Sequence, residues 1–458
     1  MAPRAAAAIL SIGDELALGQ TLDTNSRWIA DRLFSLGVRA VEHATVSDDL
    51  GDIRDALGRL GERAGLVVCT GGLGPTADDL TRQALATLLG AALVEDGDAI
   101  EHLERWFAGR GGLPSINRVQ ALRPASGAAL ENPNGTAPGI RVRDERRGAE
   151  IFCLPGPPHE MRPMFERFVA PFAGTLADGV TRARLLMTFG LGESKLAEIL
   201  DDLMDRDRGA RGLPVVGTTA SLGVVTCRIR ATGPDADSAT AALNNAEREV
   251  RERLEASNAG GIVFAARDVT QSGAGETKEA LAQTVVEMLR DRGERFAVVE
   301  SCTGGLVGGA VTAIAGSSDV FVGGWQTYSN DMKNAMVGVP DEVIAEHGAV
   351  SGVCARAMTR GALERLAASG IRADHALSVT GIAGPGGGSD DKPVGTVWIG
   401  CASRKPEGVI SGEARRFVFK GGRGAIRSWS VNTALGLLRL RLAGTEMMLL
   451  GEQERELD

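Results

Sequence analysis

Residues 294–316 read ERFAVVESCTGGLVGGAVTAIAG, an apolar run that ends in a serine and two glycines and leads into small residues. The apolar run predicts a buried strand ending at Ser301, and the small residues predict a helix from about Thr303. Residues 65–72, GLVVCTGG, show the same change from strand to glycine turn, and residues 76–90, TADDLTRQALATLLG, predict the helix that follows. Strands that alternate with helices are typical of an α/β domain with a largely parallel sheet.

The chain of 458 residues is too long for one hydrophobic core and predicts several domains. The apolar patterns predict two α/β domains with mainly parallel sheets, over residues 1–173 and 278–445. Between them, residues 174–265 predict a small α+β middle domain. Residues 266–277 are rich in Gly, Ser and Thr and predict a linker.

The composition excludes several classes of protein. The formal net charge is -9 and no block of basic residues occurs, so we expect no nucleic-acid partner. No stretch approaches the roughly 20 apolar residues that cross a membrane, so we expect no membrane partner, and the N-terminal residues are typical of a buried strand rather than a signal peptide. The cysteines are scattered without a CxxC pair, which indicates neither a zinc site nor a disulfide framework and is typical of the reducing cytoplasm.

Three side chains of the last domain are candidates for catalysis: Ser301, Tyr328 and Lys333. A serine at the carboxyl end of a strand lies close to free backbone N–H groups that could stabilise an oxyanion. Lys333, one of few lysines in an arginine-rich chain, could act as its base if burial lowers its pKa. The spacing alone leaves other interpretations open: ESCTGG could be a turn that cradles phosphate, Tyr328 a core residue, Lys333 a surface residue and Cys302 a rival nucleophile.

A glycine-rich loop, VTGIAGPGGGSDDKPVGTVW at residues 379–398, follows another predicted strand of this domain. Its backbone amides could approach a phosphate or a ribose closely, or the loop could be a surface hairpin. Arg423 and Arg427 could add a fork of positive charge for a phosphate, or could face solvent.

Residues 278–445 resemble the nicotinamide mononucleotide amidohydrolase (PncC) family in ESCTGG, YSNDMK, HGAVS and SVTGIAGPGGGSDDKPVGTVW. The resemblance implies hydrolysis of the carboxamide of nicotinamide mononucleotide to nicotinic acid mononucleotide and ammonia, without a metal or other cofactor. It implies that Ser301 attacks the amide carbon, that Lys333 takes its proton and that Tyr328 relays a proton or orients the lysine. The positions that it implies for substrate binding are Thr303, Gly304, Gly305, Asn330, Gly381, Gly384, Gly386, Gly387 and Arg423.

In the first domain, residues 69–81, CTGGLGPTADDLT, suit an anion at a helix N-terminus. Several carboxylates lie near this motif in sequence, and they would repel a diphosphate unless a divalent cation bridged them. This predicts an Mg²⁺-like metal with Asp14, Asp78 and Asp79 as candidate ligands. Alternatively, Thr76 and Asp79 form a capping box, with Thr76 as the N-cap of the helix.

Residues 1–173 resemble the molybdopterin-binding (MoaB/MogA-like) fold, in the version found in the N-terminal half of the CinA family. The resemblance is carried by GDELALGQTLDTNS, TGGLGPTADDLT, NPNGTAPG and LPGPPHEM, and it implies a metal-dependent ADP-ribose pyrophosphatase. Leu73 stands where the wider fold usually has threonine, which speaks against work on the molybdenum cofactor. The nucleotide-binding positions that it implies are Gly71, Gly72, Gly74, Asp79, Asn134, Gly135, Thr136 and Gly156.

The whole chain is thus similar to full-length members of the CinA family. The resemblance predicts a cytoplasmic, homodimeric, bifunctional enzyme of pyridine-nucleotide salvage, with nicotinamide mononucleotide and ADP-ribose as its small-molecule partners. The alternative is a non-catalytic nucleotide- or molybdopterin-binding module that acts through other partners. Release of ammonia from nicotinamide mononucleotide distinguishes the two hypotheses.

Overall fold

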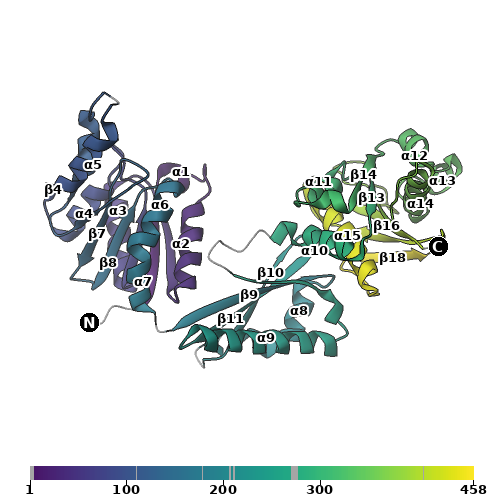
Figure 1. Cartoon of the computed structure of the whole chain (residues 1–458), viewed down its shortest axis with the longest axis horizontal. Coiled ribbons are helices and arrows are strands. Elements are labelled where there is room, and N and C mark those ends of the chain that lie inside the picture. The colour runs from purple at the N-terminus through teal and green to yellow at the C-terminus, as the bar shows by residue number, and fades with distance from the viewer. Residues whose placement is uncertain are drawn as a thin grey trace. The chain divides into compact units, whose positions relative to one another are not determined.

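A computed structural model describes residues 5–109, 111–177, 179–205, 208–209, 212–269, 277–405 and 407–457 (Figure 1). The chain divides into two compact units. The first contains most of the first 182 residues, and the second contains most of the rest. Among the described helices, none combines the length and the apolar character that a membrane crossing requires.

A six-stranded sheet in the order β2-β1-β3-β8-β7-β6 forms the centre of the N-terminal domain. The first four strands in this order pair in parallel, and β7 and β6 complete the sheet in antiparallel pairing. The sheet is therefore mainly parallel, as predicted. Its strands are β1 (Ala6–Ile12), β2 (Arg39–Val46), β3 (Leu66–Thr70), β6 (Ala128–Leu130), β7 (Gly139–Asp144) and β8 (Ala149–Leu154).

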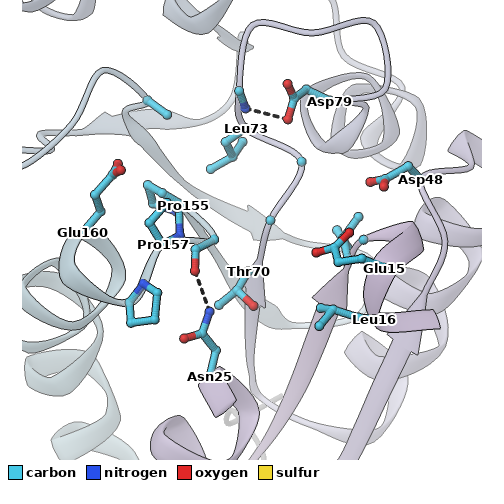
Figure 2. Close-up of a pocket in the computed structure, with 18 of the residues that line it drawn as sticks. Glu15, Leu16, Asn25, Asp48, Thr70, Leu73, Asp79, Pro155, Pro157 and Glu160 are labelled. Carbon is cyan, nitrogen blue, oxygen red and sulfur yellow. Dashed lines mark hydrogen bonds between the residues drawn. The ribbon is translucent and has the colours of Figure 1, made fainter. Parts of the chain in front are cut away.

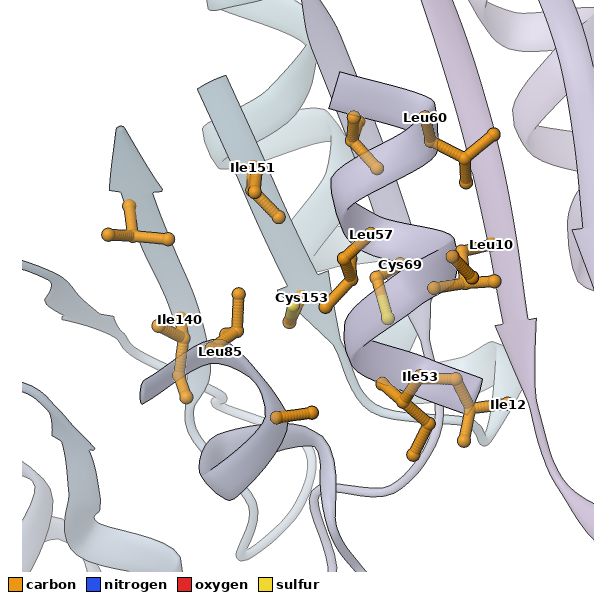
Figure 3. Packing of buried hydrophobic residues seen from close by; sticks show 14 of the residues in the cluster. Leu10, Ile12, Ile53, Leu57, Leu60, Cys69, Leu85, Ile140, Ile151 and Cys153 are labelled. Atoms are coloured by element: carbon orange, nitrogen blue, oxygen red, sulfur yellow. The ribbon is translucent and has the colours of Figure 1, made fainter. Parts of the chain in front are cut away.

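Helices cover both faces of this sheet, because successive side chains of a strand point to opposite sides. On one face, Leu57 of α3 (Leu50–Arg63) and Leu85 of α4 (Thr81–Leu89) pack against Cys69 and other strand residues (Figure 3). On the other face, α2 (Thr24–Ser35), α6 (Pro158–Met164) and α7 (Ala170–Leu176) pack against the alternate residues of the same strands. Strands that are buried on both faces read as continuous apolar runs, which explains GLVVCT.

Shorter elements complete this domain at the edges of the sheet. A π-helical turn (Phe165–Val169) connects α6 to α7. A small hairpin pairs β4 with β5. The remaining elements are α1 (Asp14–Ala17), β4 (Leu93–Glu95), α5 (Gly97–Phe107), a 3-10 helix (Ser115–Ala121) and β5 (Leu122–Pro124).

The middle domain has a four-stranded sheet in the order β10-β11-β9-β12, with two main helices, which is the predicted α+β organisation. Residues 266–268, which we assigned to the linker from composition, instead end a strand of this sheet. Residues 270–276 of the predicted linker lie outside the described residues. The elements are β9 (Val180–Phe189), α8 (Glu193–Leu200), β10 (Val215–Ser221), β11 (Val224–Gly233), α9 (Ala236–Ala256) and β12 (Val263–Asp268).

The C-terminal sheet has the order β14-β13-β15-β16-β17-β18. Only β14, β13 and β15 pair in parallel, whereas the pairings from β15 to β18 are antiparallel. The expectation of a mainly parallel sheet is wrong here, because no crossover helix separates β15, β16 and β17. The strands are β13 (Phe296–Glu300), β14 (Phe321–Gln326), β15 (His375–Gly381), β16 (Thr396–Arg404), β17 (Ile410–Val418) and β18 (Glu452–Leu457).

Two groups of helices cover this sheet on opposite sides (Figure 1). One group is α12 (Asn330–Val337), α13 (Asp341–His347) and α14 (Gly352–Ala368), and the other is α10 (Thr277–Arg292), α11 (Leu306–Thr312) and α15 (Arg423–Ala443). Helix α11 begins later than predicted, because Gly304 and Gly305 have φ angles of 58° and 94° and cannot belong to a right-handed helix.

Candidate active sites

Ser301 and Lys333 meet at the carboxyl end of β13. Lys333 Nζ lies 3.3 Å from Ser301 Oγ and donates a hydrogen bond of 2.9 Å to the carbonyl oxygen of Thr327. Both side chains are buried, with 8% of Ser301 and 1% of Lys333 exposed. The interpretation of Lys333 as a surface residue is therefore wrong. The structure brings the predicted nucleophile and base into contact.

The surroundings shift the Lys333 amine towards the neutral form that a base requires. Burial lowers the pKa of Lys333, because a low-dielectric environment disfavours the charged ammonium. Burial also raises the pKa of the Cys302 thiol to about 11. A thiol with this pKa is protonated at neutral pH and is a poor nucleophile, which favours Ser301 over its neighbour.

Glu300, which the sequence analysis did not identify, organises the turn after Ser301. Its buried carboxylate accepts hydrogen bonds from the backbone N–H groups of Gly305, Val307 and Gly308. These donors at the start of α11 are thus not available to a phosphate or an oxyanion. The amides of Cys302 and Thr303, the next two in sequence after Ser301, donate to no backbone carbonyl of the described residues.

Tyr328 lies on the surface, with 65% of the residue exposed, so the interpretation as a core residue is wrong. Its hydroxyl accepts a hydrogen bond of 3.2 Å from Arg423, which also donates to the carbonyl oxygen of Gly384. The Thr327 carbonyl, and not the phenol, orients the lysine amine. Arg423 therefore joins the loop before α12 to the glycine-rich loop.

Arg427, one helical turn after Arg423, donates a hydrogen bond of 2.8 Å to the carbonyl oxygen of Thr303. Two buried polar atoms beside this contact, Thr303 Oγ1 and Arg427 Nε, have no protein partner among the described residues. Buried polar groups without partners are rare and are typical of sites that receive a ligand or water. Arg427 thus places the start of α15 against the turn that follows Ser301.

The other predicted substrate-binding residues are distributed over three segments. Asn330 is exposed in the first turn of α12. Packing explains the glycine at position 381, because a Cβ atom there would lie 2.7 Å from the side chain of Val397. Gly386 and Gly387 lie in the exposed part of the glycine-rich loop.

A cavity of about 620 Å³ lies at the carboxyl edge of the parallel strands in the N-terminal domain (Figure 2). Glu160, Pro155 and Pro157 lie on one side of it, and Glu15, Asp48 and Asp79 lie on the other. Ligands of open α/β sheets bind at this edge. Gly71, Gly72, Gly74, Thr136 and Gly156 line the cavity as predicted, whereas Asn134 and Gly135 are not among its lining residues.

The glycine turn of this cavity requires glycine for steric reasons. A Cβ atom at Gly71 would lie 2.3 Å from the Ile12 carbonyl oxygen, and one at Gly74 would lie 2.4 Å from the Asp79 carboxylate. Arg82, buried under the turn, donates hydrogen bonds to the carbonyl oxygens of Leu73 and Gly74. Burial lowers the pKa of Arg82 to about 10, so the guanidinium remains positive at neutral pH.

The capping box at Thr76 and Asp79 is a wrong prediction. Helix α4 begins at Thr81 after Leu80, and no side chain caps it. The Asp79 carboxylate instead accepts hydrogen bonds from Gly74 N and from both Thr76 N and Thr76 Oγ1, at 2.5–2.8 Å. Asp79 therefore stabilises the glycine turn, which six residues separate from the start of α4.

The predicted metal ligands do not form a complete set. The backbone N–H groups of Asp14 and Asp48 each donate to the carboxylate of the other residue, and the Asp79 carboxylate accepts hydrogen bonds within its own turn. Among the described residues, no three His, Cys, Asp or Glu side chains are grouped as a metal ion would require. Burial, together with the charges of Asp14, Glu15 and Asp78, raises the pKa of Asp48.

The donor set therefore fits a cation only in part. Glu15, Asp48 and Asp78 line the cavity with negative charge that no described cation balances. A divalent ion would need the oxygens of a bound ligand to complete its coordination there, as is usual for Mg²⁺.

Sequence reasoning missed three residues of these sites besides Glu300. Arg82 is a single buried arginine in an amphipathic helix, and its partners are backbone carbonyls that no sequence pattern shows. Asn25 donates a hydrogen bond of 2.7 Å to the Gly156 carbonyl, and its own buried Oδ1 has no protein partner among the described residues. Glu160 accepts a hydrogen bond from Asn132. In the sequence, the only signal that could have identified these residues was a polar side chain beside a glycine turn.

Three family models match successive parts of the chain. A model described as probable molybdopterin binding domain matches residues 8–175, and one described as damage-inducible protein CinA KH domain matches residues 183–258. A model described as CinA C-terminal domain matches residues 278–442.

Relatives match the chain over nearly its whole length. The CinA-like protein of Synechococcus sp. (strain RCC307) is 42% identical, over 96% of this chain and 99% of that relative. The putative competence-damage inducible protein of Caldicellulosiruptor bescii is 38% identical, over 95% of this chain and 99% of that relative. A solved structure of competence/damage inducible protein CihA from Agrobacterium tumefaciens is 42% identical, over 37% of this chain and 97% of that one, with a TM-score of 0.33. The chain therefore belongs to the CinA family, with a MoaB/MogA-like domain, a KH domain and a CinA C-terminal domain.

Proposed function

We propose that the C-terminal domain is an amidohydrolase that converts nicotinamide mononucleotide to nicotinic acid mononucleotide and ammonia. The observation that carries the proposal is the buried contact of 3.3 Å between Lys333 Nζ and Ser301 Oγ. A neutral amine beside a serine hydroxyl can take its proton, which makes the oxygen a nucleophile.

The reaction proceeds through an acyl-enzyme. Ser301 Oγ attacks the carboxamide carbon while Lys333 accepts the hydroxyl proton, and the amides of Cys302 and Thr303 donate to the oxyanion. The C–N bond then breaks as Lys333 returns the proton to the leaving amino group, which departs as ammonia. Lys333 next takes a proton from the water that attacks the ester and gives it to Ser301 Oγ as the ester C–O bond breaks, which releases the carboxylic acid product that ionises in water.

Arg423, Arg427 and the glycine-rich loop hold the nucleotide end of the substrate in this proposal. The guanidinium of Arg423 lies next to the exposed Tyr328 hydroxyl, which suits contact with ribose or phosphate oxygens. A relay of protons through Tyr328 would need substrate or water to bridge the phenol to the lysine.

The test is release of ammonia from nicotinamide mononucleotide by the purified chain. We expect turnover in the wild type and in Cys302→Ala, and a loss of about 10⁴-fold in Ser301→Ala. Full turnover in Ser301→Ala would reject the serine mechanism. A wild type without turnover would favour a binding module.

We propose further that the N-terminal domain hydrolyses the diphosphate of ADP-ribose with an Mg²⁺-like ion. The support is the cavity of about 620 Å³ and the unbalanced charge of Glu15, Asp48 and Asp78. Glu15, Asp48 and Asp78 would hold such an ion, and its positive charge would offset the negative charge of the diphosphate. The chain's own part is to orient the ligand, through Asn25 and the glycine turn.

Cleavage of ADP-ribose to AMP and ribose 5-phosphate should depend on added divalent metal. The molybdopterin match favours a second candidate, a pterin ligand in the same cavity. A competition experiment distinguishes ADP-ribose from the pterin as the ligand of this cavity. If a pterin binds without affecting ADP-ribose cleavage, the two ligands do not share the cavity. We also propose a homodimer, which sedimentation equilibrium tests directly.

A further inference from the structure

Helix α15 links the Ser301–Lys333 site to the middle domain within the second compact unit. Its first two turns carry Arg423 and Arg427, which contact Tyr328, Gly384 and Thr303. Farther along the same helix, Asn432 Nδ2 donates a hydrogen bond of 3.0 Å to the carbonyl oxygen of Leu222. A helix is a rigid element, so a shift at one of these contacts moves the others.

The middle-domain side of this contact is a strained turn. Leu222 and Gly223 connect β10 to β11 as a two-residue hairpin, and their φ angles are 49° and 85°. Hairpins of this kind favour Asn or Gly at the first position, because an L-residue with a branched side chain pays for positive φ. A leucine in this conformation indicates that its surroundings hold it, and the bond from Asn432 does so.

The turn also lies directly against an aromatic side chain of α15. A Cβ atom at Gly223 would lie 2.8 Å from Trp429. The Trp429 ring stacks on Phe419 with centroids 5.7 Å apart. Phe419 N in turn donates to the carbonyl oxygen of Gly395, whose own amide donates to Ile382 at the start of the glycine-rich loop.

We propose that the Leu222–Gly223 turn of the middle domain positions the Ser301–Lys333 site. It acts by two routes, through α15 to Arg427 and Thr303 and through Trp429 and Phe419 to the glycine-rich loop. The residues of the turn are positioning residues, since no contact within the described part of the chain joins them to Ser301 or Lys333. The effect on catalysis rests on the proposed amidohydrolase function, but the effect on order in the site does not.

The first test is hydrogen–deuterium exchange of the full chain. Gly223→Ala places a methyl group against Trp429, and Asn432→Ala removes the bond to Leu222 with little change in shape. We expect amide exchange in residues 301–305 and 382–395 to accelerate by about threefold or more in both variants. The matched control is Gly217→Ala in β10, where a Cβ atom meets nothing within 4 Å, and its exchange should equal that of the wild type.

Unchanged exchange at the site in a folded Asn432→Ala variant overturns the proposal, even if Gly223→Ala fails to fold. Leu222→Asn is the conservative variant of the turn, because asparagine adopts positive φ more easily and keeps the carbonyl that Asn432 binds. It should show wild-type exchange at the site.

Kinetics supply the second test. Asn432→Ala should raise KM for nicotinamide mononucleotide by about three- to tenfold with kcat nearly unchanged, because the arginines on α15 hold the nucleotide and not the reacting amide. Cleavage of ADP-ribose is the internal control and should not change. If the wild type releases no ammonia, only the proposed amidohydrolase function is refuted. The hydrogen–deuterium exchange experiment then decides whether the turn positions the site.

Discussion

The two candidate sites of this chain differ in what their own side chains provide. At the C-terminal site, a hydroxyl and an amine are already in contact and buried. In the N-terminal domain, a large cavity exists, but its carboxylates repel one another and Asp79 is used by its own turn. Reactive groups in contact indicate chemistry performed by the chain, whereas an open acidic cavity indicates chemistry completed by ligand and cation. The predictions below test this difference.

After the loss of Ser301 itself, the largest expected effect is that of removing the amine. Lys333→Met should lower kcat/KM for the amide by about 10³-fold, because no other base contacts Ser301 among the described residues. The melting temperature should change little, since removal of a buried amine offsets the loss of its hydrogen bond to the Thr327 carbonyl. Lys333→Arg is the matched control for charge and should be equally inactive, because a guanidinium does not lose its proton. If Lys333→Met retains the wild-type rate of amide hydrolysis, the C-terminal site would no longer differ from the N-terminal cavity in providing its own reactive groups.

The pH profile should show the next largest effect. Only the neutral amine accepts a proton, so kcat/KM should rise with pH and level off above the folded pKa of Lys333, below the ordinary value of 10.5. Below that pKa the rise is about tenfold per pH unit. The free energy of unfolding should also rise with pH, because protonation of the buried amine costs stability as the pH falls through this pKa. A flat profile between pH 6 and 9 would contradict the role of the lysine.

In the N-terminal domain, Asp79→Ala should cost about 2–4 kcal/mol, because Gly74 N and Thr76 lose their acceptor. Differential scanning calorimetry measures the loss, and ADP-ribose cleavage should fall with it. Asp78→Ala is the neighbouring control and should affect stability little, since Asp78 is exposed. If Asp79→Ala loses cleavage without any loss of stability, Asp79 is a ligand rather than a scaffold.

The smallest expected effect is at Asp48. Asp48→Asn removes a charge that Asp14, Glu15 and Asp78 repel, so the metal-free chain should gain a few tenths of a kcal/mol, about 0.5 kcal/mol at most. The same change should weaken binding of Mg²⁺ in the presence of ADP-ribose, as measured by calorimetric titration. Equal metal affinity in both chains would show that the ion does not use this carboxylate.

The sequence predicted those features that are local in the chain. The strand before Ser301 follows from its apolar run, and the place of Ser301 in a site follows from the rule that sites form at strand ends. The contact with Lys333 was expected from Ser–Lys chemistry and from the family resemblance, and no helix was predicted around Lys333. The structure confirms that contact. The α+β class of the middle domain was also predicted, but its KH identity came only from comparison.

The remaining features depend on partners that are distant in sequence or on backbone geometry. Glu300 resembles any buried strand-end carboxylate until the amides of Gly305 and Gly308 are placed around it. Asp79 fits a capping box by spacing, and only the late start of α4 shows that it folds a turn. The antiparallel half of the C-terminal sheet follows from the absence of a crossover helix, which is harder to recognise than its presence.

The position of Tyr328 has a practical consequence for spectroscopy. It is the only tyrosine of the chain, and its hydroxyl contacts Arg423 at the mouth of the proposed amidohydrolase site. Incorporation of fluorotyrosine would therefore yield a single fluorine resonance that reports on this mouth alone. Titration of that resonance with a nucleotide would follow occupancy there without interference from the other domains.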